Sequence, residues 1–270
     1  MSATQQTQQE PEAERVVAGV GDRVLDLLDT FGDFALLIAS TFRAALRARF
    51  PALEILRQLE AIGARSTTIV LITALFTGMV LALQTGIALA RFGAKPYVGS
   101  VVGLSLAREL GPVLTALMVG GRVGAGIAAE IGSMRVTEQI DAIRSMGADP
   151  VQKLVLPRVL ASTFALPLLT VLANVVGIAG GMVLARAQFG IDPSFYLQTI
   201  TSTVTMDDFV SGVFKTFFFG ALIAWVGCFA GLRTTGGTVG VGRQTTRAVV
   251  AASIGVLITD FFLTQLWVLL

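Results

Sequence analysis

The chain has 270 residues, of which 54% are hydrophobic and 14% charged, and its formal net charge is +2. Soluble domains average roughly 45–50% apolar and about 25% charged residues, so most of this chain is expected to face lipid. So small a net charge gives no support to nucleic-acid binding. The sequence has no histidine and one cysteine, Cys228, which excludes a disulfide framework, a zinc site and a histidine general base within the chain.

The N-terminal part of the chain is polar and precedes the apolar runs. Residues 1–20 lack the basic-then-apolar order of a signal peptide and are expected to form a disordered cytoplasmic tail. Residues 21–64 mix apolar and charged side chains, which favours interfacial amphipathic helices that lie along the membrane surface, with a break at Pro51. A soluble helical hairpin packed on a partner is the alternative. The apolar positions of the first helix are Leu25, Leu28, Phe31, Phe42, Leu46 and Phe50.

Five apolar runs follow, each long enough to cross a bilayer. A helix needs about 20 mostly apolar residues to span about 30 Å of hydrocarbon. The sequence therefore predicts an all-α integral membrane protein with spans at about 67–90, 101–129, 154–185, 209–232 and 248–270.

Basic residues in the short connections predict the orientation of these spans. With a cytoplasmic N-terminus, the inside segments carry most of the arginine and lysine, and the outside loops hold only Arg91, Lys95 and Arg186. The positive-inside rule then places the C-terminus outside and the 130–150 loop in the cytoplasm.

That loop, EIGSMRVTEQIDAIRSMGADP, is the longest charged stretch between two spans. Its pattern predicts a short amphipathic helix at about 134–147 with one apolar face, and Gly147 and Pro150 signal its end. So short a helix is marginal alone in water, so its order should come from packing against a partner or from lying on the membrane. The residue pattern leaves both alternatives open.

Charged residues inside the spans are the second indication of function. An ionisable group in hydrocarbon costs at least about 2.5 kcal/mol, so it is usually paired or faces a cavity. Arg108, Glu109 and Lys215 are expected at similar depths from the outer side, around an outward-facing cavity. A purely structural Arg108–Glu109 pair is the alternative. Asp260 and Arg122 are expected at one depth from the cytoplasmic side, where they could pair with each other.

Glycines within the spans could be misread as a nucleotide site. Gly124 and Gly126 resemble half of a dinucleotide fingerprint, but they lie in an apolar span with no preceding strand, and the chain lacks a phosphate-binding GxxxxGK[ST] loop. Together with Gly120 and Gly121, and likewise Gly177 with Gly181, they are better explained by close helix packing. The segment GTVGVGRQTT is expected to be a cytoplasmic turn before the last span.

Three segments carry a resemblance to a known family. They are RELGPVLTALMVGGRVGAGIAAEIGSMRVTEQIDAIRSMGADP (108–150), VLPRVLA (155–161) and TTGGTVGVGRQTT (234–246). They resemble MlaE-type (YrbE-type) permeases, the membrane subunits of ABC transporters that move lipid between bacterial membranes. The likeness runs from about Arg57 to the C-terminus, so residues 65–270 would form the permease domain.

The resemblance implies roles for both sets of residues. The 134–147 helix would be a coupling helix that docks on a separate ATPase subunit. Its polar contacts would be Arg135, Glu138, Gln139, Asp141 and Arg144, and its apolar anchors Val136, Ile140 and Met146. Arg108, Glu109 and Lys215 would lie near a lipid-binding pocket between two permease copies, and its apolar wall would include the candidates Val80, Leu81, Leu83 and Tyr97.

The expected function is that of a permease in the bacterial inner membrane, without enzymatic activity of its own. It would move phospholipid between the inner and outer membranes and so maintain outer-membrane lipid asymmetry. ATP and magnesium would be bound by an MlaF-type ATPase, so no cofactor is expected in this chain. The further implied partners are a second permease copy, an MCE-domain protein of the MlaD type and a STAS-domain subunit of the MlaB type.

Several alternatives stay open at this point. They are an Mce-type importer of sterol or another hydrophobic molecule, an ion-coupled secondary transporter, a membrane enzyme and a scaffolding subunit. A secondary transporter would more often show repeated halves, and an enzyme would need a better acid, base or metal set than one Arg–Glu pair.

Overall fold

The computed structural model describes residues 12–47 and 52–269. Within these ranges the chain forms helices and short connections, and no strand is present. The elements, in chain order, are α1 (Glu12–Arg47), α2 (Ala52–Leu59), η1 (Glu60–Ala64), α3 (Arg65–Ala90), η2 (Lys95–Tyr97), α4 (Val98–Ser105), η3 (Leu106–Leu110), α5 (Gly111–Val119), η4 (Gly120–Gly124), α6 (Ala125–Val136), α7 (Gln139–Ser145), η5 (Val151–Val155), α8 (Leu156–Phe189), α9 (Pro193–Thr203), α10 (Met206–Leu232) and α11 (Gly237–Leu269).

Five continuous helical segments are long and apolar enough to cross a membrane. They are Ala52–Ala90, Lys95–Val136, Val151–Phe189, Met206–Leu232 and Gly237–Leu269. The described part of each predicted span lies inside one of these segments, so the prediction of an all-α protein with five spans is confirmed. Apolar length was sufficient to find them because the bilayer sets a minimum of about 20 residues.

The ends of the segments differ from the predictions in three places. Helix α1 begins at Glu12, so residues 12–20 of the expected disordered tail are helical, and residues 1–11 lie outside the described ranges. The expected interfacial stretch after Pro51 continues without a break into the first span. The expected cytoplasmic turn GTVGVGRQTT is also wrong, since it forms the first turns of α11. A helix there satisfies backbone groups that a turn would leave without partners.

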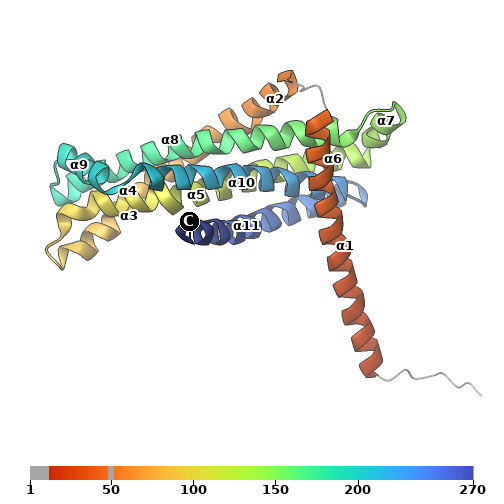
Figure 1. Ribbon diagram of the computed structural model, residues 1–270, viewed down its shortest axis with the longest axis horizontal. Helices are drawn as coiled ribbons and strands as arrows, with labels where there is room; N and C mark the ends of the chain where they lie inside the picture. Colours follow the sequence, from red (N-terminus) through yellow and green to blue (C-terminus); the bar gives the residue numbers. More distant parts are fainter. Residues whose placement is uncertain (1–11, 48–51, 270) are drawn as a thin grey trace, which may run out of the picture.

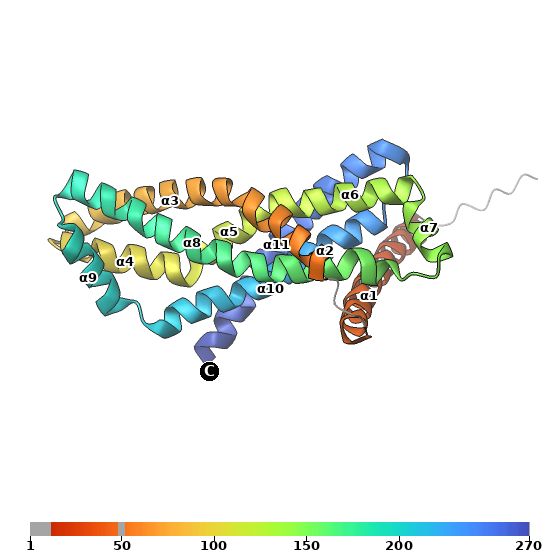
Figure 2. The ribbon, with the colours of Figure 1, turned by 90° about the horizontal axis from the view of Figure 1, so that it is seen from above.

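The helices form an elongated bundle with different elements at its two ends. Helices α3, α8 and α10 run along its length, and α11 lies against α10 (Figure 1). The connection at α7 lies at one end and α9 at the other, and both views agree on this (Figures 1 and 2). Helix α1 runs across the bundle at the α7 end, as a helix in the membrane interface would (Figure 1).

Helix α1 contacts the bundle through one narrow strip. Leu37, Thr41 and Ala44 are buried, whereas the described apolar positions predicted from the sequence are exposed: Leu25, Leu28, Phe31, Phe42 and Leu46. Phe50 lies outside the described residues. Exposed apolar side chains along a helix that crosses the bundle end agree with an interfacial position, which stays a prediction.

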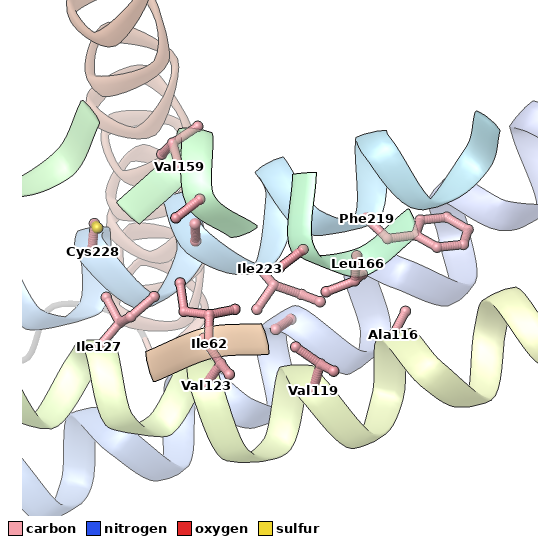
Figure 3. Close-up of a cluster of buried hydrophobic side chains, with 14 of the residues drawn as sticks. Ile62, Ala116, Val119, Val123, Ile127, Val159, Leu166, Phe219, Ile223 and Cys228 are labelled. Atoms are coloured by element: carbon pink, nitrogen blue, oxygen red, sulfur yellow. The ribbon is translucent and has the colours of Figure 1, made fainter. Parts of the chain in front are cut away.

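The main core lies between the second, third and fourth spans. Figure 3 shows Val119 and Val123 opposite Leu166 of α8 and Ile223 of α10. Cys228 is fully buried in the same cluster, where it packs as a small apolar residue. A second cluster around Tyr196 fills the α9 end.

Helix packing confirms close approach for some of the predicted glycines. A Cβ on Gly78 of α3 would lie 1.9 Å from the carbonyl oxygen of Gly177 in α8, so side chains are excluded at this crossing. A Cβ on Gly181 would lie 2.6 Å from the hydroxyl of Tyr196. Gly121 and Gly126 instead have nothing within 4 Å of an added Cβ, so close packing does not explain them within this chain.

Candidate functional site

Lys215 of α10 is the centre of a buried polar cluster formed by three spans. Its ammonium group lies 2.8 Å from both carboxylate oxygens of Glu109 in η3. It also donates to Asp260 at 3.3 Å and to the hydroxyl of Thr264 at 2.7 Å, both in α11. The Lys215 side chain is 4% exposed and the Glu109 side chain 38%. The cluster therefore joins three spans around one buried cation and stays accessible at Glu109.

A proline explains why the backbone of η3 takes part in this cluster. Pro112 has no N–H, so it cannot donate the regular helical hydrogen bond to the carbonyl of Arg108. That carbonyl instead faces the ammonium group of Lys215 at 3.5 Å. The local widening of the helix into the π-helical turn Leu106–Leu110 is of a type that is often found at functional sites.

The predicted trio is brought together only in part. Glu109 and Lys215 form an ion pair, but the guanidinium of Arg108 lies 3.4 Å from Asp208 instead. Asp208 also accepts hydrogen bonds from the backbone and hydroxyl of Thr205, which caps the start of α10. Arg108 thus contributes its carbonyl to the cluster and its side chain to the start of α10. The alternative of an Arg108–Glu109 pair finds no support among the described ion pairs.

The expected pairing of Asp260 with Arg122 is wrong. Asp260 binds Lys215, and Arg122 donates to the Ser66 hydroxyl at 2.7 Å and to the carbonyl of Ala61 at 3.4 Å. Helix α11 ends toward the α9 end of the bundle, where α10 begins. Asp260 is as many residues before Leu269, the last described residue of α11, as Lys215 is after Met206, the first residue of α10. Depth counted from the C-terminal end of the last span would therefore have placed Asp260 beside Lys215.

Thr264 was missed altogether. It is one turn after Asp260, and its hydroxyl also donates to the Asp260 carbonyl at 2.8 Å. The signal was a hydroxyl residue one helical turn from a charge within an apolar span, which places both on one helix face.

The predicted apolar wall lies on other elements. Val80, Leu81 and Leu83 belong to α3, and Tyr97 ends η2. Val80 and Tyr97 are 50% and 62% exposed, whereas Leu81 packs against the second core cluster. None of the described polar contacts of Lys215 involves these residues, so their role in lipid binding stays a proposal.

The predicted coupling helix is shorter than expected and is broken. Helix α6 ends at Val136, and α7 contains only Gln139–Ser145. Glu138 separates them with φ 59°, in the left-handed region, and it is the one non-glycine residue of positive φ in the described ranges. The chain therefore turns sharply here instead of continuing as one helix over 134–147.

The apolar face of α7 is used within the chain itself. Ile140 is fully buried in the main core, and Ile143 packs against that core. Ile140 is therefore wrong as an anchor for a partner, because it fixes α7 to the bundle. Val136 and Met146 remain available to a partner, at 37% and 71% exposure.

The polar face of α7 is held by a network of charges. Arg135 donates to both carboxylate oxygens of Asp141 at 2.8 Å, and Arg144 lies 3.2 Å from the same carboxylate. Gln139 donates to the Thr137 hydroxyl, and Glu138 is exposed. The loop therefore presents an ordered charged surface at the end of the bundle.

A further ion pair at this end was not singled out from the sequence. Arg158 of α8 is buried, donates to the Leu154 carbonyl at 2.7 Å and lies 2.8 Å from Glu130 of α6. It connects the segments before and after α7. A charged residue inside the apolar 154–185 run was the available signal.

Polar contacts also stabilise the connection at the α9 end. Asp192 caps α9, accepting hydrogen bonds from the hydroxyl and backbone of Ser194. The hydroxyl contact, followed by the backbone contact, lowers the pKa of Asp192 below its usual value. Burial raises the pKa of Tyr196 above its usual range, so its hydroxyl stays protonated. Within the described ranges, no three His, Cys, Asp or Glu side chains are grouped to hold a metal ion.

Comparison with known proteins identifies the family. The family model described as Permease MlaE matches residues 55–266. The chain is 44% identical over 230 residues to a probable ABC transporter permease protein of Synechocystis, covering 85% of this chain and 88% of that protein. It is 36% identical over 253 residues to the intermembrane phospholipid transport system permease protein MlaE of Haemophilus influenzae, covering 93% and 96%.

A plant protein is also related. The chain is 41% identical over 210 residues to the chloroplastic protein trigalactosyldiacylglycerol 1 of Arabidopsis thaliana, covering 78% of this chain and 60% of that protein. The family match includes the Lys215 cluster, the α7 connection and all or nearly all of each of the five spans. The chain therefore belongs to the MlaE family of ABC transporter permeases.

Proposed function

We propose that this chain is the membrane subunit of an ATP-driven transporter that moves phospholipid between the inner and outer bacterial membranes. The observation that carries the proposal is a bundle of five membrane-spanning segments that combines two features. One is the charge cluster, in which Lys215 is buried and Glu109 is partly exposed, and the other is the ordered charged loop at one end. The Haemophilus relative is named as a phospholipid transport permease, which supports phospholipid as the substrate.

The α7 end would receive the ATPase subunit. The exposed Glu138, Gln139 and Met146 and the Arg135–Asp141–Arg144 network offer a polar surface with one apolar contact. Movement of α7 would reach the bundle through Ile140, which belongs to the same buried cluster as Phe219. Phe219 is one helical turn after Lys215, so the two candidate sites are joined by continuous packing.

The lipid would bind between two copies of the permease. Helix α11 leaves Phe261, Phe262 and Leu266 exposed, which provides an apolar face for a second copy. Arg108, Glu109 and Lys215 would lie beside the lipid, with Val80, Leu81, Leu83 and Tyr97 along its acyl chains. Closure of two ATPase subunits on ATP would narrow this cavity and expel or reorient the lipid.

The remaining parts of the assembly follow from the same proposal. The protein would lie in the inner membrane with its N-terminus cytoplasmic and its C-terminus periplasmic, since the connections rich in arginine lie at the α7 end. An MCE-domain protein would extend the route across the periplasm, and a STAS-domain subunit would bind the ATPase.

Lipid transfer by the reconstituted complex tests the proposal. Transfer of a fluorescent phospholipid should require ATP and stop when the ATPase is inactivated by substitution of its own nucleotide site. Transfer that continues without ATP and depends on an ion gradient would overturn the proposal in favour of a secondary transporter.

The coupling surface has a separate test. Glu138→Lys and Asp141→Lys should each lower copurification of the ATPase and uncouple transport, because they reverse charge on the exposed loop. Thr246→Lys is the matched control, since it adds an exposed lysine on α11. Normal assembly and transport in both loop variants would refute docking at α7.

The lipid cavity is tested by labelling. Lys215→Ala should reduce crosslinking of a photoreactive phospholipid while the complex still assembles. Unchanged labelling in an assembled variant would show that the Lys215 cluster only holds the helices together.

A further inference from the structure

A groove lies between α1, α10 and α11 at the same end of the bundle as α7. One part of it has a volume of about 390 Å³, and its walls are almost entirely apolar: Phe31, Phe34, Leu222, Ile254, Gly255 and Ile258. An adjoining part of about 430 Å³ shares Thr30, Val226, Phe229 and Ala251 with it. The two parts therefore form one continuous space of the size usual for small-molecule sites.

The adjoining part of the groove is cationic. Arg233, Arg247 and Gln244 line it, at the end of α10 and the beginning of α11. Among the described side chains, Asp33 of α1 is the acidic group paired with this part of the groove, at 3.9 Å from Arg233. Arg247 is exposed, and within residues 12–47 and 52–269 it has no described ion pair. Among the side chains that the structure describes, this part of the groove thus has an excess of one positive charge.

We propose that this groove binds one anionic phospholipid of the surrounding leaflet, with its phosphate at Arg233 and Arg247 and an acyl chain along Val226, Ala251 and Ile254. The cationic part and the apolar part of the groove match the phosphate and the acyl chain of such a lipid. The site is separate from the Lys215 cluster and goes beyond the proposed transport function.

Helix α1 forms one wall of this site. Phe34 of α1 packs edge-to-face on Phe229 of α10 with ring centroids 5.3 Å apart, and Arg233 donates to the Thr30 hydroxyl at 3.1 Å. A lipid in the groove would contact α1 on one side and α10 and α11 on the other. Binding of the lipid would therefore help to hold α1 in place across the end of the bundle.

The headgroup contact is best tested at Arg247, because Arg233 also holds α1 through Thr30 and Asp33. A diazirine-labelled phosphatidylglycerol, incorporated into membranes that contain the full chain and its partners, should label peptides of α1, α10 and α11. Arg247→Gln should lower this labelling about fivefold, the factor for about 1 kcal/mol per basic residue near an anionic surface. Labelling by the matching phosphatidylcholine, which has no net charge, should change less. Arg243→Gln is the matched control, since Arg243 is exposed on the same helix and does not line the groove.

The acyl-chain contact has its own pair of variants. Ala251→Trp should fill the groove and lower labelling by both lipids, whereas Val250→Trp places the same side chain on the neighbouring exposed position outside the groove. Excess inorganic phosphate should not compete with the labelled lipid, because it has no acyl chain.

Three results would overturn the proposal. They are labelling that falls equally in the test and control variants, full competition by inorganic phosphate, and formation of a disulfide between two copies of Ala251→Cys, which would show that a second permease occupies the groove. These experiments need no ATP. A failure of ATP-driven transfer would therefore leave the result on this groove unchanged.

Discussion

Replacing Lys215 by methionine removes the ammonium group that bridges Glu109 and Asp260. The two carboxylates would then face each other in a site where the side chain of Asp260 is 19% exposed. Removing one partner of a buried ion pair costs about 3–5 kcal/mol. Glu109 is 38% exposed, so water relieves part of this cost, and we expect a loss near the lower end, about 3 kcal/mol.

Replacing Glu109 by glutamine is a much milder change to the same cluster. It keeps the Lys215–Asp260 pair, leaves an amide oxygen as acceptor and removes one negative charge. Hydrogen bonds between membrane helices contribute about 0.6 kcal/mol on average and up to about 1.7 kcal/mol, so we expect a loss within this range, about 1 kcal/mol. The triple variant Lys215→Met, Glu109→Gln and Asp260→Asn removes all three charges and should recover most of the stability that Lys215→Met loses.

The assay is the apparent Tm of the full chain in detergent, followed by size-exclusion chromatography after heating. At about 2–4 °C per kcal/mol, Lys215→Met should lower Tm by about 6–12 °C and Glu109→Gln by about 2–4 °C. Equal losses in the two single variants, or a triple variant no more stable than Lys215→Met, would refute the view that one buried cation compensates two carboxylates.

Three further predictions concern the helix crossings, the α7 connection and the α9 cap. Gly78→Ala should lower the stability by about 1–3 kcal/mol or more, because its Cβ meets the Gly177 carbonyl. Gly126→Ala has free space and should be neutral or stabilising. The measurement is a comparison of the Tm values of the two variants. Glu138→Val should lower the stability by about 1–3 kcal/mol through backbone strain at φ 59° and should speed hydrogen exchange in α7. Glu138→Gly should do neither, because glycine adopts positive φ without strain. Equal exchange rates in the two variants would contradict this prediction. The lowered pKa of Asp192 means that its capping contribution is complete above the unfolded-state pKa and is lost as pH falls through the folded-state value. Hydrogen exchange of the first α9 amides, corrected for the intrinsic effect of pH, should therefore become faster in the acid range in the native chain. It should not become faster in Asp192→Asn. A parallel rise in both chains would count against this role of Asp192.

Much of the fold could be predicted because the bilayer imposes simple requirements on a chain. A span must be about 20 apolar residues long, and such runs are visible without knowledge of their neighbours. The ends of the helices were less predictable. The GTVGVGRQTT segment has the glycine content of a turn, yet it forms the first turns of the last helix, where backbone hydrogen bonding outweighs local propensity.

The two candidate sites differ in how much of them could be predicted. The α7 segment was located correctly, but its apolar positions could not be divided between core and surface, because a helical period does not say which molecule covers the face. Ile140 turned out to be buried in the chain's own core, whereas Met146 is exposed.

The sequence by itself determined that this protein crosses the membrane five times, that charges are embedded at positions 109 and 215, and that a charged loop interrupts the apolar runs. Only the tertiary structure decided that Lys215 binds Glu109, 106 residues away, together with Asp260 and Thr264, while Arg108 turns to Asp208. The reason is geometric. Pairing between spans depends on the rotation and stagger of each helix, and these are set by the contacts among all five spans together.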